Sequence, residues 1–155
     1  MPSSFSFSRL ALVGLVVLPL VGAGCGSSGV SVDTNTNTIN SNDRNGNSFS
    51  AGDGATIPAN FPSDFPKYAG ATTKLAYTEN NGKSGSLVQE TSDSIEQVQA
   101  SVEAQMQANG FLKNDLFGAT PTLSVLSFRK GTIRYQVNIA RQNTITQIQS
   151  VRVEQ

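Results

Sequence analysis

Residues 132–141 alternate between apolar and polar side chains, and this pattern restricts the fold of the chain more than any other feature. One set of positions holds Ile133, Tyr135, Val137 and Ile139, and the positions between them hold Arg134, Gln136, Asn138 and Ala140. A period of two residues predicts a β-strand with one buried face and one solvated face. Antiparallel sheets that are covered on one side only commonly show such strands.

The surrounding sequence, residues 57–155, has the length of a single domain with one hydrophobic core. Strand patterns at 72–78 and 85–91 flank the turn-forming run 80–83, and further strand candidates follow at 111–117, 123–129 and 144–153. We expect an α+β fold: one amphipathic helix packed on an antiparallel sheet of about five or six strands, in the order ββαββββ, preceded by a disordered linker.

The helix is predicted for residues 94–109. Its apolar positions recur at helical spacing and would face the core: Ile95, Val98, Val102 and Met106. Asp93 is expected to cap the helix, with Glu96 three residues later completing a capping box.

The last strand alternates less cleanly than the one before it. Ile148 is out of phase with Ile145, Val151 and Val153. We therefore expect a β-bulge or an edge position for this strand, where it could capture a partner by strand addition.

Residues 57–71 contain three prolines, which favour an extended, non-helical segment. Phe61, Phe65 and Tyr68 supply aromatic surface that would pack this strap on the core. The alternative is that the strap is a proline-rich ligand for a partner.

Residues 25–56 consist mainly of Gly, Ser, Thr, Asn and Asp and predict a disordered linker. Such a coil would span about 30 Å and hold the domain away from a membrane. The alternative is a calcium-binding loop, whose first three ligand positions are matched by Asp33, Asn35 and Asn37. However, Thr38 replaces the turn glycine and Arg44 replaces the final glutamate, which favours a solvated linker.

The first 24 residues predict a secretory signal. Arg9 precedes an apolar stretch at 10–24, and small residues lead up to Cys25, the single cysteine. The stretch is shorter than the roughly 20 residues of a spanning helix. Two alternatives stay open: an uncleaved membrane anchor, or an ordinary signal peptide that leaves Cys25 as a free thiol on a freely secreted domain.

The run Gly22-Ala23-Gly24-Cys25 resembles the lipobox of bacterial lipoprotein precursors, with Gly22 where that family usually has an aliphatic residue. The resemblance implies cleavage before Cys25, diacylglycerol on its thiol, and a lipid-anchored protein of the cell membrane or outer membrane that faces the periplasm or the exterior. The run 62–71 resembles the opening of small bacterial lipoprotein domains and implies no activity.

Composition argues against catalysis and nucleic-acid binding. The chain has no histidine, and its single cysteine lies outside the predicted domain, so no metal and no cofactor are expected. The carboxylates of residues 57–155 are scattered among helix and loops, and we expect no enzyme activity. Nine Lys and Arg against eight Asp and Glu in this range do not form the basic footprint of a nucleic-acid-binding protein.

Cationic and amide side chains gather around one predicted hairpin and form a candidate face for a ligand or partner: Arg129, Lys130, Arg134, Gln136, Asn138 and Arg141. An anionic lipid, a glycan or an acidic envelope protein would suit this face, and an ordinary solvated sheet face is the alternative. The expected function is a membrane-tethered binding or envelope-assembly module. The alternative is a structural surface lipoprotein without a specific ligand.

Overall fold

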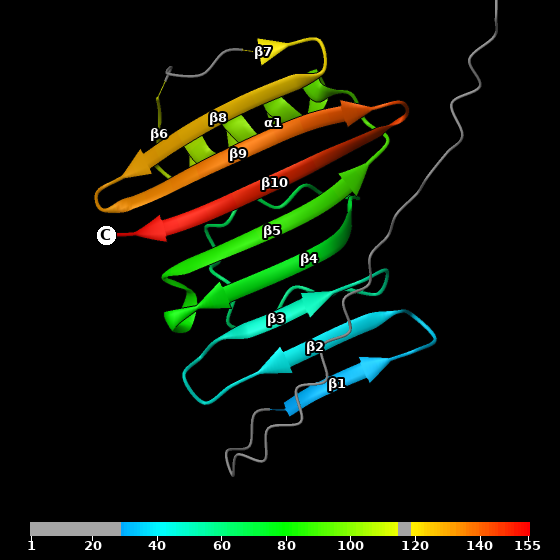
Figure 1. The fold of residues 1–155 in the computed structure, drawn as a ribbon. Coiled ribbons are helices and arrows are strands. Elements are labelled where there is room, and N and C mark those ends of the chain that lie inside the picture. Colours follow the sequence, from blue (N-terminus) through cyan, green and yellow to red (C-terminus); the bar gives the residue numbers. More distant parts are fainter. Residues whose placement is uncertain (1–28, 115–118) are drawn as a thin grey trace, which may run out of the picture.

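Ten strands form one antiparallel sheet in residues 29–114 and 119–155, the part of the chain that this computed structural model describes (Figure 1). The elements are β1 (Gly29–Asp33), β2 (Thr38–Asn42), β3 (Ser48–Ala51), β4 (Thr72–Glu79), the 3₁₀ turn η1 (Asn80–Gly82), β5 (Ser84–Thr91), α1 (Ile95–Ala108), β6 (Leu112–Asn114), β7 (Ala119–Thr120), β8 (Leu123–Lys130), β9 (Ile133–Gln142) and β10 (Ile145–Glu154). Their order across the sheet is β1-β2-β3-β4-β5-β10-β9-β8-β6, and β7 pairs with β8.

The predicted strand number and order are wrong. Five strands precede the helix and five follow it, in place of the expected ββαββββ with five or six strands. Three of the additional strands, β1 to β3, lie within residues 29–51, where the sequence predicted a disordered linker. The α+β class therefore holds only in its broad sense, as one helix on an antiparallel sheet among the described residues.

Polar side chains of β2 and β3 are hydrogen-bonded to the segment that follows β3. Thr38 Oγ1 accepts a hydrogen bond from Gly54 N at 2.9 Å, and Ser50 Oγ accepts one from Thr56 N at 2.9 Å. The Asp43 carboxylate accepts backbone hydrogen bonds in the turn between β2 and β3, which lowers its pKa. These bonds satisfy groups that would otherwise favour water, so a polar sequence joins the sheet.

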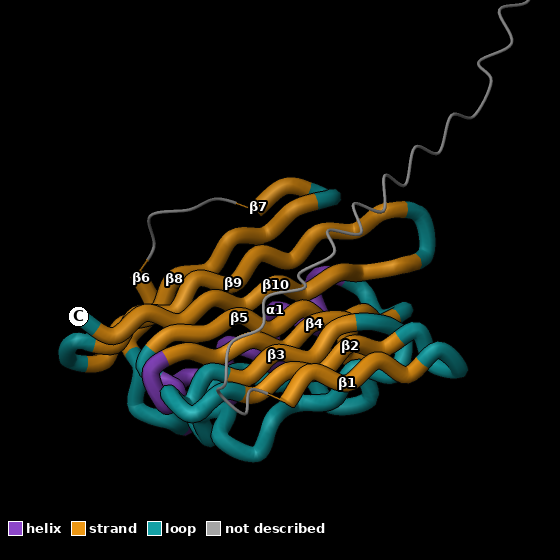
Figure 2. The backbone as a smooth tube through the Cα atoms, turned by 60° about the horizontal axis from the view of Figure 1, so that its bottom comes forward, coloured by secondary structure: helices purple, strands orange, loops and turns teal. Residues whose placement is uncertain are grey.

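One face of the sheet is covered by α1 and by the loop segments between β3 and β4 (Figure 2). Phe61 and Phe65 of the strap are buried and Tyr68 is partly buried, which confirms the prediction that the strap packs on the core. The Phe65 ring meets the Tyr135 ring edge-on, with 5.1 Å between centroids. The core thus lies between this sheet face, the helix and the strap.

The predicted apolar side of the helix is confirmed, because Ile95, Val98, Val102 and Met106 are all buried. The predicted cap is wrong by one residue. Ser94 caps the helix in a capping box with Gln97, and the Asp93 carboxylate instead accepts a hydrogen bond from Tyr68 Oη at 2.7 Å. Because the Asp93 carboxylate is bound to Tyr68, the next residue, Ser94, caps the helix with its side-chain oxygen.

The last strand, β10, is central, so the predicted edge position is wrong. It pairs with β5 on one side and with β9 on the other, in continuous register on both sides. Ile148 is out of phase because it belongs to the core face, whereas Ile145, Val151 and Val153 lie on the opposite face. With both edges paired, β10 offers no site for strand addition.

Several predictions lie outside the described residues: the signal sequence at 1–24, the lipidation site Cys25, and the part of a predicted strand at 115–117. Within the described ranges, no helix has the length and apolar character needed to cross a membrane.

Candidate functional site: the open face of the sheet

The sheet face opposite α1 and the strap is called the open face here. Directly paired residues of antiparallel strands lie on the same face, so the register identifies its members. One row runs across eight strands at a single level and consists of Val32, Ile39, Ala51, Leu75, Val88, Gln149, Asn138 and Val125. The row is apolar from β1 to β5 and contains two neighbouring amides on β10 and β9.

The open face of β9 and β10 is rich in amides. Gln136 donates to Asn138 Oδ1 at 3.2 Å, and Asn138 donates to Gln149 Oε1 at 3.5 Å. Gln147 is exposed on the same face of β10. Each amide offers both a donor and an acceptor, so this half of the face can bind hydroxyl or amide groups of a ligand.

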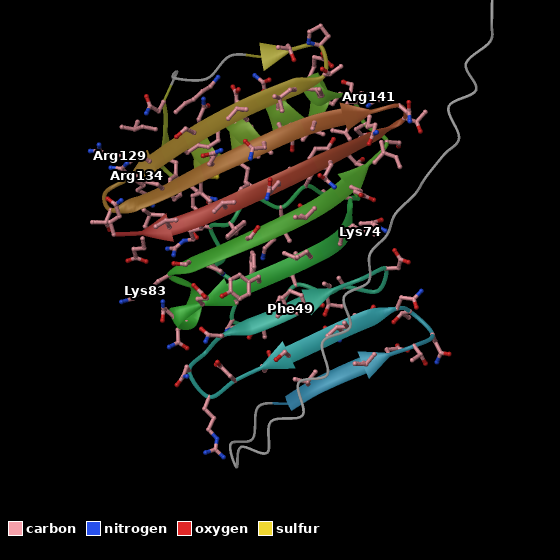
Figure 3. The ribbon with its side chains drawn as sticks, in the orientation of Figure 1. Phe49, Lys74, Lys83, Arg129, Arg134 and Arg141 are labelled. Carbon is pink, nitrogen blue, oxygen red and sulfur yellow. The ribbon has the colours of Figure 1, made fainter. Side chains whose placement is uncertain are left out.

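Arg129 and Arg134 are directly opposite each other on β8 and β9 (Figure 3). Both are exposed, and neither guanidinium has a hydrogen-bond or ion-pair partner among the described residues. Two like charges in direct cross-strand register are destabilising in the absence of an anion. This pair, named the arginine corner, is therefore the strongest anion-binding feature of the open face.

The predicted cationic cluster is divided by the sheet. Arg129, Arg134, Gln136 and Asn138 share the open face. Lys130 instead donates to Asn109 O at 2.8 Å, at the C-terminal end of α1. The opposite end of β9 carries Arg141 (Figure 3), which is engaged by other partners.

Arg141 binds groups on the covered side of the sheet. Its Nη1 donates to Asp93 O at 2.6 Å and to Thr146 Oγ1 at 2.8 Å. Lys130 and Arg141 thus bind backbone carbonyls of the protein itself, and only part of the predicted face can meet a ligand.

A hollow of about 290 Å³ lies at the β9–β10 turn, away from the arginine corner. Its lining residues are Glu90, Ala140, Gln142, Asn143, Thr144, Ile145 and Gln147. Glu90 is 3.8 Å from Lys74 Nζ, which also binds Asp53 at 2.9 Å. The hollow is therefore lined by both polar and apolar groups, and its carboxylate is already paired.

Both halves of the open face also carry exposed apolar side chains. Among the described residues, the large apolar side chains that are exposed are Val30, Val32, Ile39, Leu112, Leu123, Ile145 and Val153. The register places every one of them on the open face. Exposed apolar residues scattered singly are normal, but their collection on one face marks an interaction surface.

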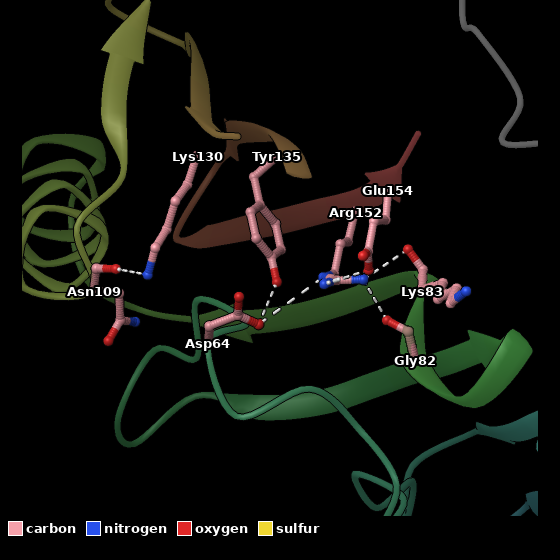
Figure 4. Close-up of polar contacts among 8 residues, drawn as sticks. All are labelled: Asp64, Gly82, Lys83, Asn109, Lys130, Tyr135, Arg152 and Glu154. Atoms are coloured by element: carbon pink, nitrogen blue, oxygen red, sulfur yellow. Dashed lines mark hydrogen bonds and ion pairs between the residues drawn. The ribbon is translucent and has the colours of Figure 1, made fainter. Parts of the chain in front are cut away.

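A buried polar cluster that the sequence did not indicate lies on the covered side (Figure 4). Arg152 donates to Gly82 O at 2.5 Å and to Lys83 O at 2.7 Å. Asp64 Oδ1 accepts from Tyr135 Oη at 2.9 Å and is 3.9 Å from Arg152 Nε. Burial, followed by the bond to Asp64, raises the pKa of Tyr135.

This cluster joins the strap, the β4–β5 connection and β10, so its role is structural. In the sequence, the buried position of Arg152 is indicated only by its alternation with the neighbouring residues. Arg152 occupies a core-face position of β10, a strand in which apolar and polar residues alternate weakly. Among residues 29–114 and 119–155, no group of three His, Cys, Asp or Glu side chains is placed to hold a metal ion.

Comparison with known proteins gives no assignment: no protein-family model matches this chain, and neither a curated protein nor a solved structure is significantly similar to it. The open face and the N-terminal sequence are therefore the features of this chain that bear on its function.

Proposed function

We propose that this protein is a lipid-anchored component of the bacterial cell envelope that binds an anionic partner through the arginine corner of its open face. The observation that carries the proposal is the direct opposition of Arg129 and Arg134, both exposed and both without a partner among the described residues. A phosphate or carboxylate between them would remove their mutual repulsion and accept charge-assisted hydrogen bonds.

The neighbouring amides favour an acidic glycan as this partner. Gln136 pairs directly with Ser127 on the open face, and Asn138 and Gln149 continue the polar surface across β9 and β10. Hydroxyl groups of a sugar chain match such mixed donors and acceptors, whereas its acidic groups would bind the arginines. An acidic protein or an anionic lipid would use the arginines without needing the amides.

A binding role is favoured over catalysis by the engagement of the carboxylates. Asp64 binds Tyr135 and Arg152, Asp93 binds Tyr68, and Glu103 binds Lys113 at 2.9 Å. Each of these carboxylates joins two segments of the fold. None of the three lies on the open face, where a ligand would bind.

Mass spectrometry of the protein from membranes of its own host tests the anchor. We expect an N-terminus at an acylated Cys25, and a Cys25→Ser variant that is lost from the membrane fraction. An unmodified Cys25 in a soluble protein would reject the lipoprotein assignment and leave a freely secreted domain.

Titration of the protein with acidic and neutral envelope glycan fragments, followed by NMR, tests the binding face. We expect Arg129→Gln and Arg134→Gln each to weaken binding of the acidic fragment roughly tenfold, the scale of one charged hydrogen bond. Lys83→Gln, an exposed cation beside β5, two strands from Arg134, is the matched control (Figure 3). Equal binding by all variants would leave the structural-lipoprotein alternative, and selective binding of anionic vesicles would identify a lipid partner.

A further inference from the structure

The edge of the sheet at β1 and β2 carries an exposed apolar patch, named the edge patch, which consists of Val30, Val32 and Ile39. Val30 and Val32 are each 64% exposed and Ile39 is 46% exposed. Val32 and Ile39 are direct cross-strand partners, so the patch is continuous across the two strands.

The polarity of the sheet is reversed at this edge. In β9 the apolar side chains face the core and the polar side chains lie on the open face. In β1 to β3 the positions on the covered side are polar, including Ser31, Asn40 and Ser50, and the apolar residues lie on the open face. A strand that places its valines away from the protein core is suited to contact something else.

The edge patch also extends toward the middle of the sheet. Ile39 pairs with Ala51, Ala51 with Leu75, and Leu75 with Val88. At a strand spacing of about 4.8 Å, this apolar band from β1 to β5 is about 19 Å wide. On the open face of the described strands β1 to β3, no side chain carries a charge: the residues there are Val30, Val32, Ile39, Ser41, Phe49 and Ala51.

The described part of the chain begins next to this patch, at Gly29. Only residues 26–28 separate Cys25 from Gly29, the first residue of β1. Four peptide units reach at most about 14 Å, so an acylated Cys25 would hold β1 within this distance of the lipid headgroups. The expected tether of about 30 Å does not apply, because residues 29–51 belong to the sheet.

We propose that the edge patch rests on the lipid bilayer, with Val30, Val32 and Ile39 in contact with the boundary between headgroups and acyl chains. This inference depends on the proposed lipid anchor at Cys25. The anchor keeps the edge patch close to the bilayer and so raises its effective concentration at the membrane. A small uncharged apolar surface is then sufficient to hold the sheet edge on the membrane. The arginine corner, on β9 and β8 at about 29 and about 34 Å from β1 along the sheet, would then project from the membrane.

A fluorescent probe at position 32 tests this contact. Acylation blocks the thiol of the single cysteine, so Val32→Cys introduces one free thiol into the mature protein. Ser31→Cys is the matched control, because the neighbouring residue of the same strand is exposed on the opposite face. Each acylated protein is labelled with an environment-sensitive dye and placed in phosphatidylethanolamine–phosphatidylglycerol vesicles that contain spin-labelled lipid.

We expect a blue-shifted emission for the label at position 32 and several-fold stronger quenching by the spin-labelled lipid than at position 31. Equal, water-like emission at both positions, in protein that mass spectrometry shows to be acylated, would overturn the membrane contact and leave the anchor intact. A blue shift that needs no lipid and increases with protein concentration would assign the patch to a second copy of the chain. An unmodified Cys25 would overturn both proposals.

Discussion

Individual side chains connect segments that are far apart in this sequence, and Arg152 is the clearest case. It is buried on β10, yet its guanidinium binds two carbonyls of the β4–β5 connection and lies 6.0 Å from the Tyr135 ring centroid. The same guanidinium is also ion-paired to Glu154 at 3.2 Å. A buried cation with several partners is costly to disrupt, because removal of one group leaves the others unsatisfied.

We expect Arg152→Ala to lower the free energy of unfolding by about 3 kcal/mol, since Asp64 loses its ion-pair partner and two carbonyls lose their donor. Urea denaturation measures the change. Lys83→Ala is the control, because the exposed Lys83 side chain lies next to the same carbonyls, and its removal should change stability by less than about 0.5 kcal/mol. Equal effects of the two substitutions would contradict the assigned role of Arg152.

Tyr77 tests the electrostatics of the open face. Its hydroxyl donates to Glu79 Oε1, and this bond, with burial as the second cause, raises its pKa to about 12. In the unfolded chain tyrosine ionises near pH 10, so the contribution of Tyr77 to stability is complete below about pH 10 and decreases as the pH rises from about 10 to 12.

Removal of the carboxylate, Glu79→Ala, should bring the pKa of Tyr77 back toward about 10, because both the hydrogen-bond acceptor and the negative charge are lost. NMR of ¹³C-labelled tyrosine over alkaline pH measures each residue separately. Tyr68 is the internal control, since its pKa is raised by Asp93 and should not move. Ionisation of Tyr77 near pH 10 in the unmodified protein would reject this account.

At the scale of elements, the sequence predicts the helices and strands whose formation depends on residues close together in the chain. The strands at 72–78 and 123–129, the strand at 132–141 and the helix were each predicted within one or two residues of β4, β8, β9 and α1. Asn80, Asn81 and Gly82 have positive φ angles, as the predicted turn requires. The strand β10 was misjudged because a central strand with apolar residues on both faces looks irregular when one wet face is assumed.

Ile148 and Ile145 form a matched pair that tests the assigned phase of β10. Ile148 is 2% exposed in the core, whereas Ile145 is 50% exposed on the open face. We expect Ile148→Ala to destabilise the fold by about 3 kcal/mol, and Ile145→Ala by less than about 1 kcal/mol. Thermal and urea denaturation measure both, and a reversed order would place the strand in the opposite phase.

At the scale of the whole molecule, the extent of the sheet was not predictable from local pattern. The strands β1 to β3 are short and rich in Asn, Ser and Thr, and they join the sheet only because β3 pairs with β4, opposing Phe49 to Tyr77. Composition measures what a segment can bury by itself, whereas pairing with a distant strand depends on the rest of the fold. The candidate site shows the same limit: the sequence indicated Arg129 and Arg134, but not which cations share a face.

Hydrogen exchange tests whether residues 29–51 belong to the sheet. We expect backbone amides of β3 to be protected, those of β5, β9 and β10 to exchange most slowly, and those of β1 to exchange fastest, because β1 is the outermost described strand on its side. Exchange of the whole 29–51 range at the rate of an unfolded peptide would restore the linker interpretation.

Phe49→Ala makes this test specific for the pairing of β3 with β4. The substitution removes the ring that lies opposite Tyr77, so it should increase exchange in β1 to β3 while β9 and β10 keep their protection. This difference in protection between β1 to β3 and the central strands follows from the fold. The first three strands pair with the rest of the sheet only through β3 and β4, whereas β10 is paired on both sides. If protection falls equally in all strands, β1 to β3 unfold together with the core, and the sheet behaves as one cooperative unit.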